Sequence, residues 1–190
     1  MNTEYRPRIA DDILRHKLQG VGAILIEGAK WCGKTSTAEQ QAKSMVYMSN
    51  PTLLPQYLTY VDTAPEMLLD GETPRLIDEW QLAPKLWDCI RFMVDHRKGM
   101  GQYILTGSSV PADMSHVHHT GTGRFARLLM RPMTLWESGD SNGKISLKQM
   151  FDAPQSIAAE CNISLQDIAF LTCRGGWPQT IDLPKENQLE

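Results

Sequence analysis

One eight-residue stretch constrains the fold of this chain more than any other. Residues 28–35 read GAKWCGKT and match the pattern G-x-x-x-x-G-K-[ST] at every required position. The apolar run Ala23–Ile26 precedes the stretch and predicts a buried strand, whereas residues 35–43 predict a helix. A strand, a glycine-rich loop and a helix in this order are the context that the pattern needs. The sequence therefore predicts that this loop binds a phosphate group.

The residue types in the loop suit that chemistry. Glycine adopts positive φ at little cost, so the backbone can wrap around an anion and point its N–H groups at phosphate oxygens. Lys34 adds a positive charge near the β- and γ-phosphates, and the Thr35 hydroxyl can ligate Mg²⁺. The expected nucleotide-binding residues are Gly28, Ala29, Lys30, Trp31, Cys32, Gly33, Lys34, Thr35 and Ser36. The alternative is a glycine-rich turn that binds no ligand.

Length and composition restrict the remaining possibilities. A chain of 190 residues can form one domain with a sizeable core, or one domain and the start of another. The net charge of −3 argues against a dedicated nucleic-acid binder. The sequence contains no apolar run of about 18 residues, so no membrane helix is predicted. The first residues of the chain are polar and lack the apolar core of a signal peptide. The four cysteines are scattered and form no C-x-x-C pair, which favours a reduced, cytoplasmic protein.

Predicted strands and helices alternate along the first two thirds of the chain, which indicates an α/β fold. Helices are predicted at 9–18, 65–69 and 84–97, and strands at 102–109 and 128–130. Two segments, 45–48 and 57–61, both fit the second strand of the sheet, and the sequence does not decide between them.

A pair of acidic residues supplies a second candidate part of a nucleotide site. The short apolar stretch Leu76–Ile77 runs directly into Asp78 and Glu79. Asp78 would hold Mg²⁺, and Glu79 would orient and polarise a water molecule that attacks the γ-phosphate. The alternative is an ordinary strand end.

Polar residues after the next predicted strand are candidates for contact with the γ-phosphate. Thr106 and Ser108 carry hydroxyl groups that could sense this phosphate or position water, or could simply form a turn. Arg124 and Arg127 flank a glycine-rich loop farther along, where an arginine could stabilise transition-state charge in cis or from a neighbouring subunit. Either arginine could instead pair with surface acids. Three histidines at 116, 118 and 119 lack the spacing and companion ligands of a metal site and indicate a solvated loop.

Residues 134–137 form a capping box that predicts a helix start, and a polar linker follows at 139–143. After the linker the alternation of strands and helices ends, and only helices are predicted, at 146–151, 154–160 and 164–174. We expect a nucleotide-binding core at 1–138 and a helical segment at 139–190. The abrupt ending after an apolar stretch also leads us to expect that a further C-terminal domain is missing.

Several of these motifs together resemble the prokaryotic AAA-type ATPases that carry a C-terminal domain of unknown function. The motifs lie at 28–35, 76–81, 104–108, 123–124 and 131–137, and the resemblance extends from about Tyr5 to Ile181. It implies a three-layer α/β/α P-loop NTPase fold with a central, mainly parallel sheet, followed by a small helical segment. It also implies binding of ATP and Mg²⁺, and hydrolysis.

The resemblance assigns roles to single residues. It implies Thr35 and Asp78 as Mg²⁺ ligands, Glu79 as the catalytic base and Ser108 as a polar sensor. It also implies Arg124 as an arginine finger or sensor. The sequence departs from the pattern at Lys30 and Trp31, where relatives often carry arginine and a small residue.

The leading hypothesis is thus a Mg²⁺-dependent ATPase whose nucleotide state, ATP or ADP, drives movement or partner binding. The sequence does not fix the oligomeric state, and a homo-oligomer is one option. A protein or nucleic-acid partner could bind through the missing C-terminal region, and no membrane partner is expected. A scaffold with little turnover remains an alternative, as does a small P-loop kinase with Arg124, Arg127 and Arg131 in its lid. A GTPase is disfavoured because no N-K-x-D or T-K-x-D element occurs. Residues 5–9 are the candidates for adenine contact.

Overall fold

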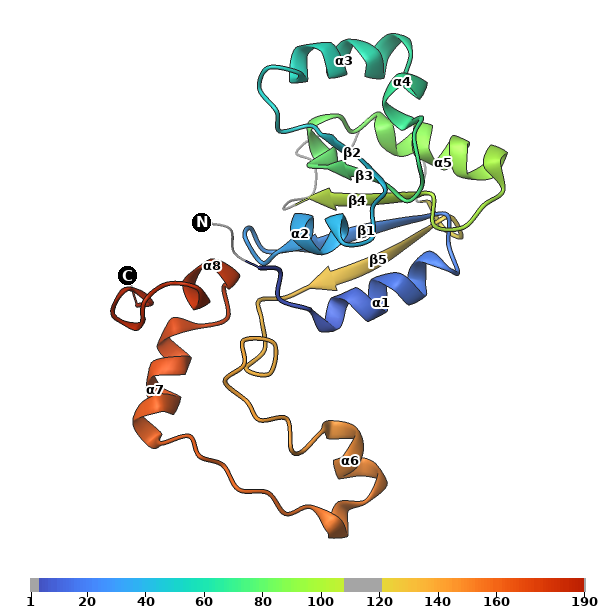
Figure 1. The fold of residues 1–190 in the computed structure, drawn as a ribbon. Coiled ribbons are helices and arrows are strands. Elements are labelled where there is room, and N and C mark those ends of the chain that lie inside the picture. The colour runs from blue at the N-terminus through green and yellow to red at the C-terminus, as the bar shows by residue number, and fades with distance from the viewer. Residues whose placement is uncertain (1–3, 108–120, 190) are drawn as a thin grey trace. The chain divides into compact units, whose positions relative to one another are not determined.

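The computed structural model describes residues 4–107 and 121–189. The chain divides into two compact units. The first unit comprises Arg8–Arg131 and contains the sheet (Figure 1). The second comprises Met1–Pro7 together with Pro132–Glu190. The compact core therefore ends at Arg131, whereas the sequence analysis placed the domain boundary after residue 138.

A five-stranded sheet in the order β2-β3-β4-β1-β5 forms the centre of the first unit. All neighbouring strands are parallel, so their carboxyl ends meet at one edge of the sheet. The strands are β1 (Ala23–Gly28), β2 (Ser44–Tyr47), β3 (Arg75–Asp78), β4 (Tyr103–Gly107) and β5 (Phe125–Met130). In register, Gly28 of β1 pairs with Met130 of β5, and Asp78 of β3 pairs with Thr106 of β4.

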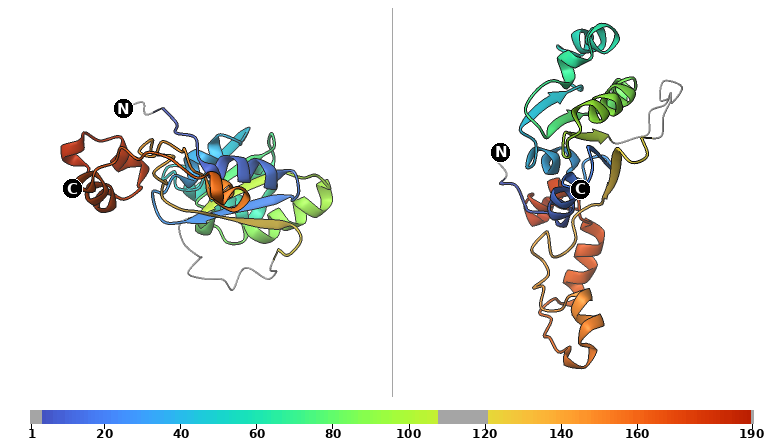
Figure 2. Two further views of the ribbon diagram at one scale, coloured as in Figure 1. Left: turned by 90° about the horizontal axis from the view of Figure 1, so that it is seen from below. Right: turned by 90° about the vertical axis from the view of Figure 1, so that its right-hand side faces the viewer.

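Helices cover both faces of this sheet and complete three layers (Figure 2). On one face, α1 (Ile9–Leu18) and α2 (Lys34–Glu39) pack with Ile24 and Ile26 of β1. On the other face, Ala23 and Leu25 of β1 pack with α3 (Leu54–Thr63), α4 (Glu66–Leu69) and α5 (Leu86–Arg97). Because both faces are buried, the central strands are apolar along their length instead of alternating. The predicted three-layer α/β/α fold with a parallel sheet is confirmed.

Of the two segments that fit the second strand, 45–48 is the one that lies in the sheet, where residues 44–47 form β2. Residues 57–61 lie within α3, so the strand considered there was wrong. A proline near the start of α3 suits the first helical turn, where no backbone donor is needed. Tyr57, Tyr60 and Val61 then pack toward the core at helical spacing.

The capping box at 134–137 forms without starting a helix. The backbone N–H of Thr134 donates to Glu137 Oε2 at 2.7 Å, and the N–H of Glu137 donates to Thr134 Oγ1 at 3.2 Å. The segment nevertheless remains a turn, because Gly139 adopts a φ of 82° and ends the helical geometry. The predicted helix at 154–160 is also wrong, since only a short 3-10 turn, Pro154–Ser156, is present.

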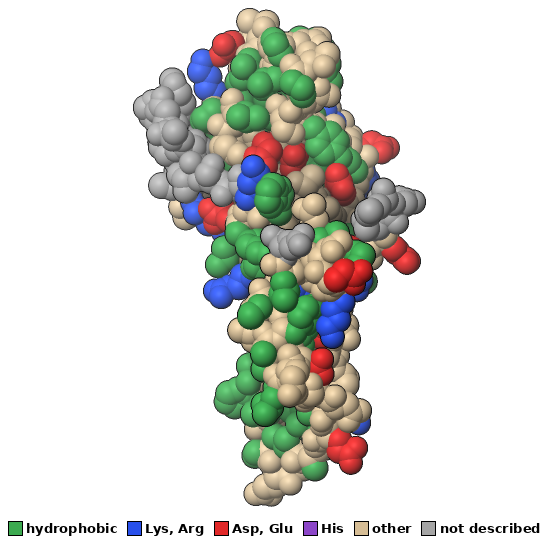
Figure 3. Space-filling model, turned by 90° about the vertical axis from the view of Figure 1, so that its left-hand side faces the viewer, with side chains coloured by type: hydrophobic (Ala, Val, Ile, Leu, Met, Phe, Trp, Pro, Cys, Tyr) green, Lys and Arg blue, Asp and Glu red, His purple; other side chains and the backbone are tan. Residues whose placement is uncertain are grey.

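The second unit contains α6 (Leu147–Asp152), α7 (Leu165–Arg174), α8 (Pro178–Ile181) and a 3-10 turn at Lys185–Asn187. As predicted, α7 begins with a capping box formed by Ser164 and Asp167, and it ends at Gly175. Leu147, Phe151 and Leu165 are exposed hydrophobic residues of this unit. Figure 3 shows hydrophobic side chains at the surface on one face of the molecule. Among the helices in the described parts of the chain, none is long and apolar enough to cross a membrane.

Candidate nucleotide site

The glycine loop follows β1 at the carboxyl edge of the sheet and leads into α2. Gly28 has a φ of 151° and Gly33 a φ of 99°, which are conformations that favour glycine. A Cβ atom on Gly28 would lie 2.2 Å from the backbone oxygen of Met130. Only a glycine therefore allows the loop to pass this close to the end of β5.

Lys34 lies buried beside the first residues of the loop. Its ammonium group donates hydrogen bonds to the backbone oxygens of Gly28 at 2.9 Å and Ala29 at 2.8 Å. A buried ammonium group needs such partners, because an unpaired charge in this position would be costly. The sequence-predicted phosphate ligand is thus held at the loop that would enclose the phosphate.

Asp78 joins the loop to the sheet. Its side chain is only 5% exposed, and Oδ1 accepts hydrogen bonds from Thr35 Oγ1 at 2.7 Å and Thr106 Oγ1 at 2.6 Å. The two residues predicted to ligate Mg²⁺, Thr35 and Asp78, are therefore in direct contact. Carboxylate and hydroxyl oxygens suit this hard cation. Thr106 is fully buried and fixes Asp78, a role that differs from the γ-phosphate contact considered in the sequence.

No set of three histidine, cysteine, aspartate or glutamate side chains in the described ranges could by itself enclose a metal ion. Ser108 and the three histidines at 116, 118 and 119 lie outside the described residues, and the predicted sensor at Ser108 stays a prediction.

Glu79 follows β3 directly and adopts a left-handed backbone conformation with a φ of 56°. This conformation turns the chain out of the strand and into the 3-10 helix η1 (Trp80–Leu82). One carboxylate oxygen of Glu79 accepts a hydrogen bond from the side-chain amide of Gln81. The two adjacent acids thus have different surroundings, with Asp78 buried in the sheet and Glu79 partly exposed at its edge.

Arg124 lies at the opposite edge of the sheet. Its backbone oxygen accepts a hydrogen bond from the N–H of Ala23, immediately before the first residue of β5. The six residues of β5 span about 20 Å, which separates Arg124 from the phosphate loop of its own chain. Arg124 is therefore too far from the phosphate loop of its own chain for the role in cis that the sequence analysis considered.

The side chain of Arg124 contacts the carboxylate of Asp95. Its Nε donates to Asp95 Oδ1 at 2.8 Å. The hydrogen bond raises the pKa of Arg124 and lowers the pKa of Asp95. Arg127 likewise pairs with Glu27 at 3.0 Å. Both arginines thus occupy surface ion pairs, as the alternative interpretation of the sequence allowed.

Sequence reasoning placed Arg8 only among the candidates for adenine contact and missed that it supports the phosphate loop. Its side chain is 7% exposed, and its guanidinium donates to the backbone oxygens of Cys32 at 2.9 Å and Arg131 at 2.8 Å. One side chain thus connects the start of α1, the phosphate loop and the end of β5. No local pattern marks Arg8, because its partners are far away in the sequence.

Trp31 and Lys30 mark the departure from the family pattern. Trp31 is 71% exposed, and its φ of 65° places it in the left-handed region that costs other residues about 1–2 kcal/mol relative to glycine. The Lys30 ammonium lies 5.2 Å from the centre of the Trp31 ring, within the range of a cation–π interaction. The loop therefore keeps its backbone course without glycine at this position.

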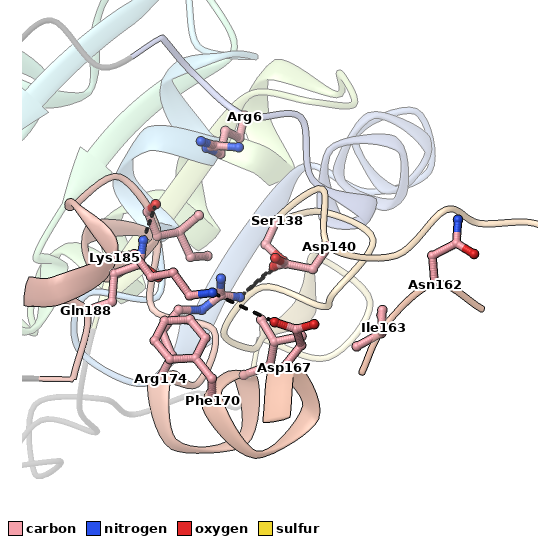
Figure 4. Close-up of a pocket in the computed structure, with 12 residues that line it drawn as sticks. Arg6, Ser138, Asp140, Asn162, Ile163, Asp167, Phe170, Arg174, Lys185 and Gln188 are labelled. Carbon is pink, nitrogen blue, oxygen red and sulfur yellow. Dashed lines mark hydrogen bonds and ion pairs between the residues drawn. The ribbon is translucent and has the colours of Figure 1, made fainter. Parts of the chain in front are cut away.

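The second unit contains a polar cavity of about 350 Å³, lined by residues that include Arg174, Asp140 and Ser138 (Figure 4). Arg174 pairs with Asp140 at 2.7 Å, and Ser138 donates to the same carboxylate at 2.5 Å. Burial raises the pKa of Asp140, but these hydrogen bonds outweigh burial and lower it. The charged groups of this cavity satisfy one another, which gives the arrangement a structural role within the unit.

Replacing Arg8 by methionine should destabilise the first unit by about 3 kcal/mol, because two charge-assisted hydrogen bonds to backbone oxygens are lost. Urea unfolding followed by circular dichroism would measure this change. The matched control is Arg6→Met, which removes an exposed ion pair with Asp182 and should cost less than about 1 kcal/mol. Equal, small effects of the two substitutions would contradict the supporting role of Arg8.

No curated protein matches the chain. Solved structures with some likeness include PCH-2 of C. elegans, which is 16% identical over 68% of this chain and 42% of its own, with a TM-score of 0.36. Another is a Signal Transduction ATPase with Numerous Domains with a tetratricopeptide repeat sensor from Pyrococcus horikoshii. It is 16% identical over 98% of this chain and 32% of its own, with a TM-score of 0.47.

The chain thus spans less than half the length of either protein. A family model described as an AAA domain matches residues 21–138, which is more than half of the chain. This range contains the phosphate loop and all five strands of the parallel sheet. The chain therefore belongs to the AAA domain family of P-loop ATPases.

Proposed function

We propose that this protein is a Mg²⁺-dependent ATPase that hydrolyses ATP to ADP and phosphate, and that its nucleotide state drives a conformational or partner-binding change. The observation that carries this proposal is the hydrogen bond between Thr35 of the phosphate loop and Asp78 of β3. It brings the phosphate-binding and acidic parts of the sequence together at one edge of the sheet. Lys34 and Glu79 flank these residues in the chain.

Binding would begin at the loop of residues 28–36. Its backbone N–H groups and the ammonium group of Lys34 supply positive charge for the β- and γ-phosphates. The ammonium group would exchange its bonds to the Gly28 and Ala29 oxygens for bonds to phosphate oxygens. Residues 5–9 remain the candidates for adenine contact.

Thr35 and Asp78 would hold Mg²⁺, the former directly and the latter through water. The ion would neutralise charge on the β- and γ-phosphates. Thr106 keeps the Asp78 carboxylate in place through its own hydrogen bond, so this ligand needs little reorganisation when the ion binds.

Glu79 would act as the general base. Its carboxylate takes a proton from water while the water oxygen bonds to the γ-phosphorus and the bond to the β-phosphate oxygen breaks. The products are ADP and inorganic phosphate. The position of Glu79 at the partly exposed strand end supports this role, since water can reach the carboxylate there.

Lys34→Ala should abolish measurable ATP binding, because the ammonium group expected at the β- and γ-phosphates is removed. Isothermal titration calorimetry with Mg²⁺-ATP would test this. Lys43→Ala is the matched control, since it removes an exposed lysine just beyond α2 and should leave the affinity unchanged. Unchanged affinity in Lys34→Ala would refute the assignment of the phosphate loop.

Glu79→Gln should bind ATP normally and lose at least about a hundredfold in kcat, because the amide cannot accept the proton. Phosphate release under saturating Mg²⁺-ATP would measure the loss. Glu66→Gln makes the same chemical change at an exposed position on α4 and should keep full turnover. A variant at position 79 that lost binding and kept turnover would show that the base has been assigned wrongly.

We also propose that Arg124 acts on the nucleotide of a neighbouring subunit. Its place at the amino edge of the sheet is remote from its own phosphate loop, yet its side chain is exposed and can face a second copy. Arginine fingers supplied in trans stabilise the transition-state charge on the γ-phosphate. The ion pair with Asp95 would then be exchanged for phosphate contact in the oligomer.

Mixing Arg124→Ala protein with Glu79→Gln protein should restore some of the turnover that each variant lacks. Mixed interfaces combine an intact Glu79 from one chain with an intact Arg124 from the other. Arg127→Ala, which removes an arginine from another surface ion pair, should by itself keep turnover. Absence of rescue in an oligomer demonstrated by light scattering would exclude the role in trans.

A further inference from the structure

Gln81 contacts the proposed catalytic base directly. It is the middle residue of η1, and its side-chain Nε2 donates a hydrogen bond to Glu79 Oε2. The other end of the amide, Oε1, is buried and has no hydrogen-bond partner in the described part of the chain. The bond to Glu79 is therefore the polar interaction that holds this side chain among the described residues.

The end of β4 is shaped to accept Gln81. A Cβ atom on Gly107 would lie 2.5 Å from Gln81 Oε1 and 3.1 Å from the indole nitrogen of Trp80. The backbone of Gly107 is not in the left-handed region, so its own conformation does not require glycine. The absence of a side chain at position 107 instead provides the space that the amide of Gln81 occupies.

We propose that Gln81 is a positioning residue that orients the Glu79 carboxylate toward the attacking water. Glu79 lies at a strand end, where its side chain could otherwise adopt several rotamers. The amide of Gln81 donates its hydrogen bond to Oε2 of Glu79 and leaves Oε1 of Glu79 available to accept the proton from water. Contact with Gly107 fixes Gln81 against the strand that adjoins both β1 and β3. This inference rests on the proposed role of Glu79 as the base.

Gln81→Met tests the inference, because methionine keeps the length of the side chain and removes the amide. The expected result is a fall in kcat of at least about tenfold, the value of one hydrogen bond to a charged group. The KM and the dissociation constant for Mg²⁺-ATP should stay within about twofold, since Gln81 contacts the base and not the phosphate loop. Gly107→Ala should give the same pattern by displacing the amide without removing it.

Gln102→Met is the matched control. Gln102 is also buried, also has an unpartnered Oε1 among the described residues, and donates to the backbone oxygen of Gly99 at 2.7 Å. It lies just before β4, at the amino edge of the sheet. Its replacement should lower stability without lowering kcat, which separates loss of a buried glutamine from loss of positioning.

A folded Gln81→Met protein with kcat within twofold of the wild type would overturn the inference, as would a parallel change of kcat and KM. If Gln81→Met does not fold, Gly107→Ala gives the same two readouts and the same criteria. Glu79→Gln, assayed beside them, separates the two hypotheses. Turnover in Glu79→Gln would remove the base and the positioning role together, whereas an inactive Glu79→Gln with a fully active Gln81→Met would overturn the positioning role alone.

Discussion

The rest of the site depends on the pair of hydrogen bonds that Asp78 accepts from Thr35 and Thr106. These three residues come from β3, from the first turn of α2 and from β4. A buried carboxylate without such partners would cost several kcal/mol, so the bonds fix both the loop and the strand end. Asp78 and Thr106 are also paired in the register of β3 and β4. The register of the sheet therefore fixes the geometry of the site.

Arg8 provides a second anchor for the loop. Its guanidinium links the loop at Cys32 to the end of β5 at Arg131, while the Cys32 side chain is itself fully buried in the core. The loop is therefore held on one side by the core and on the other by Asp78, at the carboxyl edge of the sheet. Such fixed dipoles and charges are the kind of preorganisation that stabilises developing charge most effectively.

The sequence predicted those parts of the fold whose signals are local. The strand before the loop, the acidic strand end and the capping box at Ser164 were correct, because each depends on neighbouring residues. The same kind of signal failed at 57–61 and at Thr134. At 57–61 the apolar residues face the core at helical spacing, and at Thr134 the following Gly139 ends the turn before a helix can form. At 57–61 the surrounding structure outweighed the local preference, whereas at Thr134 a nearby glycine ended the helical geometry.

The sequence by itself determined the phosphate loop and the acidic pair, since the residues that carry this chemistry are contiguous in the chain. Only the tertiary structure decided which edge of the sheet each charged group occupies. It placed Arg124 at the amino edge, bound Arg8 both to Cys32 of the loop and to Arg131, which lies 123 residues farther along the chain, and set Gln81 against Gly107. The physical reason is that these contacts depend on strand order and register, which pair residues that no local pattern connects.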